Sequence, residues 1–157
     1  MIITFCGHSS VPDANEVRRW LCLVLEQFIY EKNIVFYLGG YGEFDRLAAE
    51  VVRQKQKANP IAKAVLVIPY LNKKYDASGY DYTLFPPLES VPPRYAISKR
   101  NTWMVEQASV VIAYVTHGWG GAAKSLSYAR SKGKRVILYP EIYEKSEVPP
   151  KEREARQ

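Results

Sequence analysis

Two glycine-rich turns, each between an apolar segment and a helical pattern, are the part of the sequence best suited to hold a charged ligand. The first is Gly39-Gly40-Tyr41-Gly42, and the second is Gly118-Trp119-Gly120-Gly121-Ala122. Glycine allows positive φ and lets a ligand approach the backbone amides closely. The helix that follows points its unpaired N–H groups and the positive end of its dipole at the same place. One such turn can be a geometric need of a short loop, but two predict a site for an anionic, phosphate-bearing ligand.

Side chains near these turns supply groups that would complete the site. Lys124 and Ser125 lie in the first turn of a predicted helix, where an ammonium and a hydroxyl can supplement the amides around one phosphate. Arg100 and Asn101 begin another predicted helix, and a planar guanidinium can hold a phosphate or carboxylate with two hydrogen bonds. We expect Arg100 to be exposed, so that its removal weakens binding and hardly changes stability. The structural alternatives are a solvated Lys124 and an ion pair of Arg100 with Glu106 or a loop carboxylate.

Two carboxylates and two histidines lie beside the same turns. Glu43 and Asp45 follow the first turn, where they would handle protons, bind ribose hydroxyls or hold Mg²⁺ if the protein is an enzyme. Capping of the helix N-terminus is the structural alternative for both. His8 and His117 have no carboxylate at metal-ligand spacing, and no Gly-x-Ser-x-Gly nucleophile motif is present. The sequence therefore predicts no metal, no cofactor and no nucleophilic triad.

Apolar strands that alternate with helical patterns predict one α/β domain. The expected strands are 2–6, 34–38, 63–68, 109–115 and 135–139, and the expected helices are 13–30, 43–57, 98–107 and 120–131. Strands that are apolar along their whole length are typical of a parallel sheet covered by helices on both faces. This predicts a Rossmann-like, doubly wound, mainly parallel five-stranded sheet in residues 1–140, followed by a polar tail in 141–157. Ligands of such folds bind at the carboxyl ends of the strands, where both glycine turns and Gly7-His8-Ser9 fall.

The segment 69–97 interrupts the alternation and shows no clear periodicity. It is rich in tyrosine and contains the pairs Pro86-Pro87 and Pro92-Pro93. Loops of this length are uncommon unless they are functional or disordered, and the aromatic content argues against disorder. Because the segment follows the carboxyl end of a strand, it is a candidate lid over the site. A packing insertion or a subunit contact is the alternative.

Composition narrows the classes of partner. The formal net charge is +6, from 22 basic and 16 acidic residues, which suits a phosphate-rich partner but does not separate a nucleotide from a nucleic acid. No basic stripe interleaves with the loop tyrosines, so we expect a nucleotide-derived ligand and no nucleic acid, with base stacking on those tyrosines as the weaker alternative. No stretch approaches the roughly 20 apolar residues of a membrane span, and Cys6 and Cys22 form no metal or disulfide pattern. We expect a cytoplasmic homo-oligomer that does not bind membranes.

The motifs together resemble those of the SLOG superfamily, which includes the lonely-guy cytokinin-activating enzymes, the DNA-processing protein A domain and many uncharacterised bacterial and phage proteins. The similarity is strongest to the uncharacterised members. It is carried by Gly7-His8, by 39–48 with Phe44-Asp45, by 95–105 around Lys99-Arg100-Asn101, and by 120–134 with Gly120-Gly121-Ala122. The resemblance covers nearly all of residues 1–140. It implies a Rossmann-like domain that binds a nucleotide or nucleotide derivative at the two glycine turns, as a sensor, sequestering protein or regulator.

The chain departs from the lonely-guy enzymes at the residue that assists their reaction. Those enzymes resemble Pro-Gly-Gly-x-Gly-Thr-x-x-Glu, in which the glutamate assists N-glycosidic cleavage, whereas here Trp119 precedes the glycines and Ser127 replaces the glutamate. A weaker resemblance to nucleoside deoxyribosyltransferases also lacks their nucleophilic glutamate. Ligand binding is therefore the leading function. The alternative is a nucleoside 5′-monophosphate N-glycosidase or a deoxyribosyltransferase-like enzyme, with Glu43 or Asp45 as the carboxylate.

Overall fold

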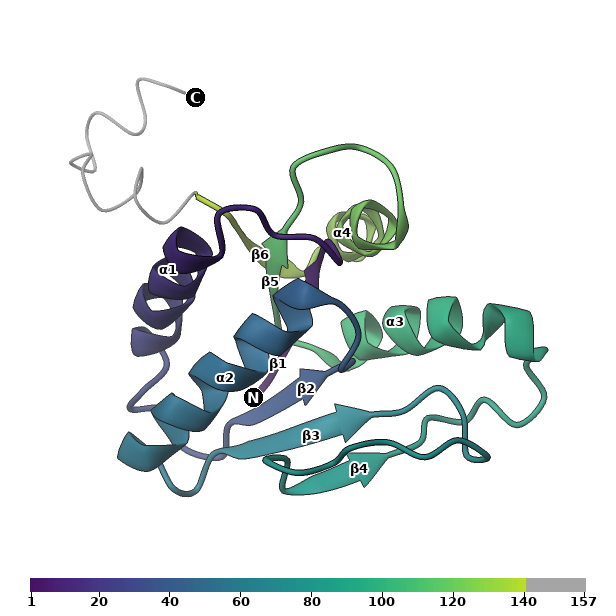
Figure 1. Ribbon diagram of the computed structural model, residues 1–157, viewed down its shortest axis with the longest axis horizontal. Helices are drawn as coiled ribbons and strands as arrows, with labels where there is room; N and C mark the ends of the chain where they lie inside the picture. The colour runs from purple at the N-terminus through teal and green to yellow at the C-terminus, as the bar shows by residue number, and fades with distance from the viewer. Residues whose placement is uncertain (141–157) are drawn as a thin grey trace.

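Six parallel strands form one sheet in the order β4-β3-β2-β1-β5-β6 (Figure 1). The computed structural model describes residues 1–140, in which the strands are β1 (Ile2–Gly7), β2 (Val35–Leu38), β3 (Lys63–Val67), β4 (Tyr82–Leu84), β5 (Val110–Tyr114) and β6 (Arg135–Leu138). The Rossmann-like α/β fold predicted from the sequence is confirmed, with six strands instead of five. The tail predicted for 141–157 lies outside the described residues.

The additional strand, β4, comes from the segment 69–97, for which the sequence predicts no regular element. It has only three residues and pairs with β3. Asp81 anchors the pairing, because its carboxylate accepts a hydrogen bond from the amide of Ala64 (2.7 Å) and its own amide donates to the carbonyl of Ala64 (2.8 Å). Three residues are too few to show a strand periodicity, which is why the sequence does not reveal β4. The segment ends in the short 3-10 helix η1 (Pro93–Tyr95).

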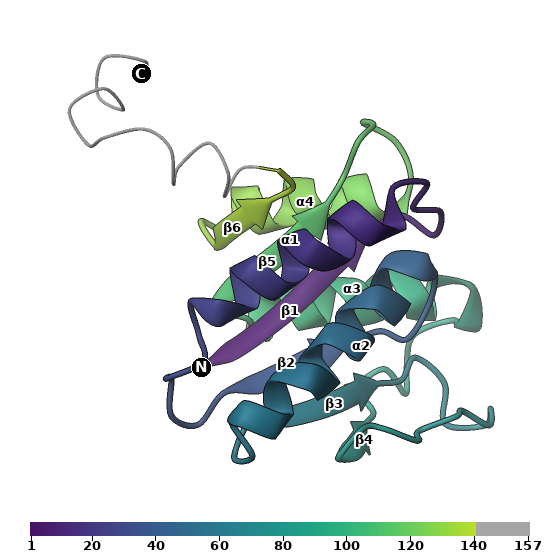
Figure 2. The ribbon, with the colours of Figure 1, turned by 60° about the vertical axis from the view of Figure 1, so that its left-hand side comes forward.

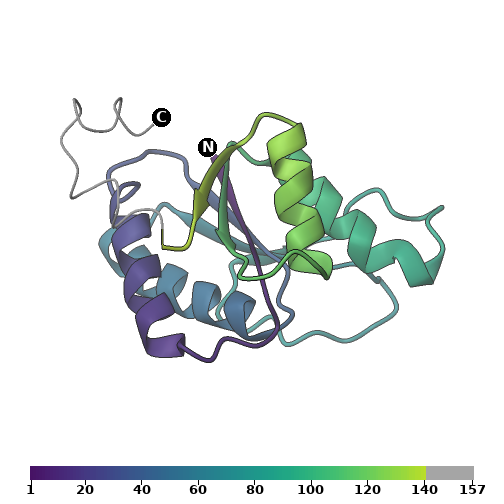
Figure 3. The same ribbon diagram turned by 90° about the horizontal axis from the view of Figure 1, so that it is seen from above.

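Two helices cover each face of the sheet. α1 (Ala14–Glu26) and α2 (Glu43–Ala58) lie on one face, and α3 (Ala96–Gln107) and α4 (Gly121–Ser131) lie on the other, as Figures 2 and 3 show. Alternation along the strands divides the core accordingly. In β1, Ile3 and Phe5 pack with the helices α1 and α2, whereas Cys6 packs with residues of α3 and α4 such as Val105 and Leu126. Both faces of β1 are therefore buried, and its one buried polar side chain, Thr4, donates a hydrogen bond to the carbonyl of Tyr37 (2.9 Å).

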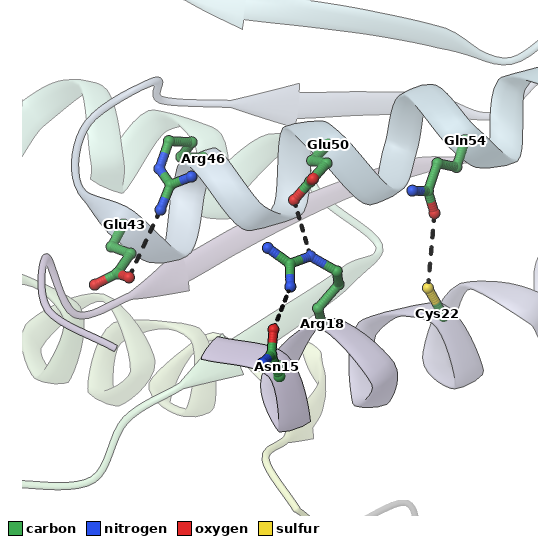
Figure 4. Close-up of polar contacts among 7 residues, drawn as sticks. All are labelled: Asn15, Arg18, Cys22, Glu43, Arg46, Glu50 and Gln54. Atoms are coloured by element: carbon green, nitrogen blue, oxygen red, sulfur yellow. Dashed lines mark hydrogen bonds and ion pairs between the residues drawn. The ribbon is translucent and has the colours of Figure 1, made fainter. Parts of the chain in front are cut away.

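The outer surface between α1 and α2 carries polar contacts (Figure 4). Arg18 of α1 donates from Nε to the Glu50 carboxylate of α2 (3.0 Å) and from Nη1 to the Asn15 amide oxygen (2.8 Å). Exposed ion pairs of this kind contribute little to stability. The two helices are held by their apolar stripes instead, with Trp20 and Leu47 completely buried. Within the part of the chain that the structure describes, no helix has the length and apolar character needed to cross a bilayer.

Candidate functional site

A cavity of about 560 Å³ opens at the carboxyl ends of β1 and β5. These two strands flank the point at which the strand order changes direction, because β2 to β4 extend from one side of β1 and β5 and β6 from the other. Doubly wound folds bind ligands at this point, and the volume is in the range of small-molecule sites. The wall is formed by the loop after β1, one side of α3, the loop after β5 and the first turn of α4.

The structure brings many of the predicted site residues together in this wall. The residues that line it are Gly7, His8, Ser9, Tyr41, Asp45, Arg100, Asn101, Gly120, Gly121, Ala122 and Ser125. The predicted residues outside the lining are Gly39, Gly40, Gly42, Glu43, Gly118 and Lys124. The segment 69–97, the candidate lid, contributes only Ile97. That these residues bind a ligand stays a prediction.

Other lining residues were not singled out by the sequence. Thr4 and Cys6 of β1 and Met104 of α3 form the inner part of the wall, and Trp119 lies near the N-terminus of α4. The first three are buried and look like any other core position in the sequence. Trp119 lies inside the second glycine turn, and this position is the one feature of the sequence that could have indicated that it lines the cavity.

The helix that follows the first glycine turn uses its first two amides internally. The N-terminal amides of α2 donate to the loop after β1: Glu43 to the carbonyl of Ser9 (3.0 Å) and Phe44 to that of His8 (3.4 Å). Gly42 has φ +90°, and a Cβ there would lie 2.8 Å from the Cα of Ser9. Close packing of the first glycine turn against the loop after β1 therefore explains Gly42. This is the geometric need of a short loop, the alternative to ligand binding.

The second glycine turn leaves its amides free. The first backbone hydrogen bond of α4 runs from Lys124 to the carbonyl of Gly120 (3.1 Å), and within residues 1–140 nothing accepts a hydrogen bond from the amides of Gly121, Ala122 and Ala123. A Cβ on Gly121 would meet no atom within 4 Å, so packing does not require this glycine. Unpaired amides, the positive end of a helix dipole and open space are together what an anion needs.

Arg100 is buried, so the prediction of an exposed arginine at a helix start is wrong. α3 begins at Ala96, which places Arg100 in its second turn, and only 3% of the residue is exposed. Its Nη1 donates to the carbonyls of Gly39 (3.0 Å) and Val67 (2.8 Å), just after β2 and at the end of β3. The guanidinium thus ties α3 to the carboxyl ends of two strands. The predicted alternative, an ion pair with Glu106, is also not seen, since no such pair occurs within residues 1–140.

The two candidate carboxylates lie in different surroundings. Glu43 accepts a hydrogen bond from the amide of Val11 (2.8 Å) and pairs with Arg46 (3.6 Å), away from the cavity. Asp45 lines the cavity and accepts a hydrogen bond from the amide of Tyr41 (3.1 Å). Burial raises the pKa of Asp45 to about 6, although the Tyr41 amide and the positive charge of Arg100 act in the opposite direction. The carboxyl of Asp45 is therefore a weaker acid than that of an exposed aspartate.

Three aromatic rings form a column in the wall of the cavity. The His117 ring is stacked between those of His8 and Trp119, with centroid distances of 3.8 Å on each side and interplanar angles of 12° and 20°. Nε2 of His8 accepts a hydrogen bond from the amide of Thr116 (2.9 Å), which corresponds to a neutral imidazole. Burial lowers the pKa of His8, and the neighbouring His117 adds to this effect. No cluster of three metal-ligating side chains occurs in residues 1–140.

No protein-family model and no curated protein matches this chain, but solved structures match its fold. The X-ray structure of TM1055 is 17% identical with a TM-score of 0.62, over 88% of this chain and 74% of that one. DNA processing protein A from Helicobacter pylori, described for its single-stranded DNA binding mode, is 14% identical with a TM-score of 0.61, over 88% of this chain and 64% of that one. The molybdenum cofactor carrier protein from Chlamydomonas reinhardtii is 15% identical with a TM-score of 0.59, over 87% and 74%.

The fold and the cavity at its switch point define a Rossmann-like α/β protein of the doubly wound class. More particularly, its fold is shared with TM1055, DNA processing protein A and the molybdenum cofactor carrier protein. At these identities the likeness concerns the fold.

Proposed function

We propose that the protein binds a nucleotide or nucleotide-derived ligand in the cavity at the ends of β1 and β5, as a sensor, sequestering protein or regulatory module. The observation that carries the proposal is the first turn of α4, where the amides of Gly121, Ala122 and Ala123 are unpaired beside open space in the wall. A phosphate seated there would accept these hydrogen bonds and interact with the helix dipole. The hydroxyl of Ser125, which also lines the cavity, is within the same helical turn.

The related structures agree with a ligand-binding role at a coarse level. One is described as binding single-stranded DNA and another as carrying the molybdenum cofactor. The net charge of +6 suits an anionic ligand, whether a nucleic acid or a small molecule. The cavity volume of about 560 Å³ favours a small ligand. The homo-oligomeric state and the cytoplasmic location expected from the sequence stay predictions.

The substitution Gly121→Glu tests the proposal, because it separates binding from folding. The new carboxylate would lie at the N-terminus of α4, where negative charge stabilises a helix by about 0.3–1 kcal/mol, and the new Cβ would meet no atom within 4 Å. The same charge would repel a phosphate. Calorimetry against nucleoside monophosphates, NAD, ADP-ribose and cyclic nucleotides should therefore show binding to the parent protein and at least tenfold weaker binding to Gly121→Glu, at equal or higher melting temperature.

Gly121→Gln is the matched control, because it has the same length without the charge. It should lose less affinity than Gly121→Glu. If no phosphorylated nucleoside stabilises the well-folded parent protein, the proposed function is wrong.

One observation favours a second function, N-glycosidic cleavage of a nucleoside 5′-monophosphate. Asp45 is a carboxyl in the cavity wall with a pKa of about 6, which suits general acid or base chemistry near neutral pH. Water would add to C1′ of the ribose as the N-glycosidic bond breaks, and the reaction would release the protonated free base and ribose 5-phosphate. Asp45→Asn would abolish it, whereas Glu43→Gln would not, because Glu43 lies outside the cavity. Chromatography of the products after incubation with each monophosphate decides between turnover and binding alone.

A further inference from the structure

Trp119 is an exposed aromatic side chain that is nevertheless held in place. It is 72% exposed, and one face of its indole is stacked on His117, which is stacked in turn on His8. The hydrogen bond from the Thr116 amide to Nε2 of His8 fixes the bottom of this column to the chain after β5. Because the indole of Trp119 is exposed to solvent, it does not contribute to the core. The stacked rings of His117 and His8 nevertheless fix its orientation.

The position of Trp119 relates it to the anion site. It lies two residues before Gly121, whose amide is the first of the unpaired amides of α4. A Cβ on either neighbouring glycine, Gly118 or Gly120, would meet no atom within 4 Å. Packing therefore requires neither glycine, and the exposed indole of Trp119 between them lines the cavity. Tyr41, 69% exposed, lines the same cavity from the first glycine turn.

We propose that the exposed face of Trp119 is the stacking platform for the base of a nucleoside monophosphate whose phosphate is bound at the N-terminus of α4. This inference rests on the proposed function and specifies its ligand: a planar heteroaromatic base joined to a phosphorylated sugar, in contrast to a sugar phosphate alone. Every nucleobase presents a π face to an aromatic ring, so stacking contributes affinity with little base preference. The column of His117 and His8 holds the indole in position before the ligand arrives, which reduces the ordering cost of binding.

Fluorescence provides a direct readout, because the three tryptophans differ in environment. Trp20 is completely buried, Trp103 is stacked on Tyr37 with 5.6 Å between centroids, and Trp119 is exposed in the cavity wall. The four ribonucleoside 5′-monophosphates should quench the emission of the parent protein on binding, and ribose 5-phosphate should not. Trp119→Phe should abolish the quenching but retain most of the affinity. The matched control Trp103→Phe should leave the quenching intact.

Affinity measurements on Trp119→Ala complete the test. The substitution should weaken the binding of the monophosphates roughly 5- to 150-fold, the range expected for the loss of one stacked base, and leave ribose 5-phosphate binding unchanged. Equal affinity of the parent protein for ribose 5-phosphate and the monophosphates, or unchanged monophosphate affinity in Trp119→Ala, overturns this inference and leaves the proposed anion site standing. Failure of the monophosphates and of ribose 5-phosphate to bind at all overturns the inference and counts against the proposed function as well.

Discussion

At the scale of single residues, Arg100 shows how burial changes the role of a side chain. Its guanidinium satisfies the carbonyls of Gly39 and Val67 in a buried environment, and Nε donates to the side chain of Asn101 (2.8 Å). A charged group in this position costs desolvation energy, which its hydrogen bonds offset. Arg100 therefore acts chiefly in holding the site together, and any contact with a ligand is additional.

Arg100→Ala should lower the free energy of unfolding by about 2–4 kcal/mol, because the buried carbonyl of Val67 and the partly buried carbonyl of Gly39 lose this donor. Arg100→Lys should recover part of the loss, since an ammonium cannot reproduce the planar donor geometry. Urea denaturation of both variants measures the effect, with the exposed neighbour Lys99→Ala as the control. Unchanged stability in Arg100→Ala would show that the guanidinium does not clamp the strand ends.

Asp45 makes stability depend on pH in a defined direction. Its pKa is raised from 3.8 to about 6 in the folded protein, so the unfolded chain loses this proton at lower pH than the native state. Stability contributed by the protonated form is complete below pH 3.8 and is lost as the pH rises through about 6. Asp45→Asn keeps an acceptor for the Tyr41 amide without the charge. It should remove this slope and raise the free energy of unfolding at pH 7 by about 1–2 kcal/mol.

Denaturation of Asp45→Asn between pH 4 and pH 7.5 checks this expectation, with the exposed Glu89→Gln as the control. The same variant should bind phosphorylated ligands more tightly at pH 7, because a carboxylate in the wall repels a phosphate. A pH profile identical to that of the parent protein would contradict the assignment of the raised pKa to Asp45.

At the scale of elements, two glycine turns that look alike in the sequence have different roles. The turn before α2 is closed by the carbonyls of His8 and Ser9, whereas the turn before α4 has free amides. Gly42→Ala should destabilise the fold by about 1–3 kcal/mol, because φ is +90° and the new Cβ meets the Ser9 backbone. Gly118→Ala is the matched control and should change stability little, since nothing lies within 4 Å. If thermal denaturation shows that Gly42→Ala and Gly118→Ala lose equal stability, the two turns do not differ in structural role.

At the scale of the whole molecule, the layered fold leaves a cavity of small-molecule size at the switch in strand order. The fold is shared with a protein described for single-stranded DNA binding, so nucleic acid is the partner to exclude. We expect a labelled single-stranded oligonucleotide to show no binding by fluorescence anisotropy at low salt. Binding that weakens steeply as salt is raised would instead indicate phosphate-backbone contacts by the basic surface.

The sequence by itself determined the alternation of strands and helices and the edge of the sheet at which the site lies. These depend on local properties, namely the apolar periodicity of each segment and the glycines that end it. The sequence does not predict β4, because a strand of three residues is too short to show an apolar periodicity. Pairing with β3 and the hydrogen bond of Asp81 stabilise it instead.

Only the tertiary structure decided the roles of the site residues, because their partners are distant in the chain. Arg100 meets carbonyls 61 and 33 positions away, and His8 meets the Thr116 amide 108 positions away. No local pattern shows that the loop after β1 occupies the amides of α2 and leaves those of α4 free. Packing of the two loops against each other decides this, and it is why one glycine turn is structural and the other is open to a ligand.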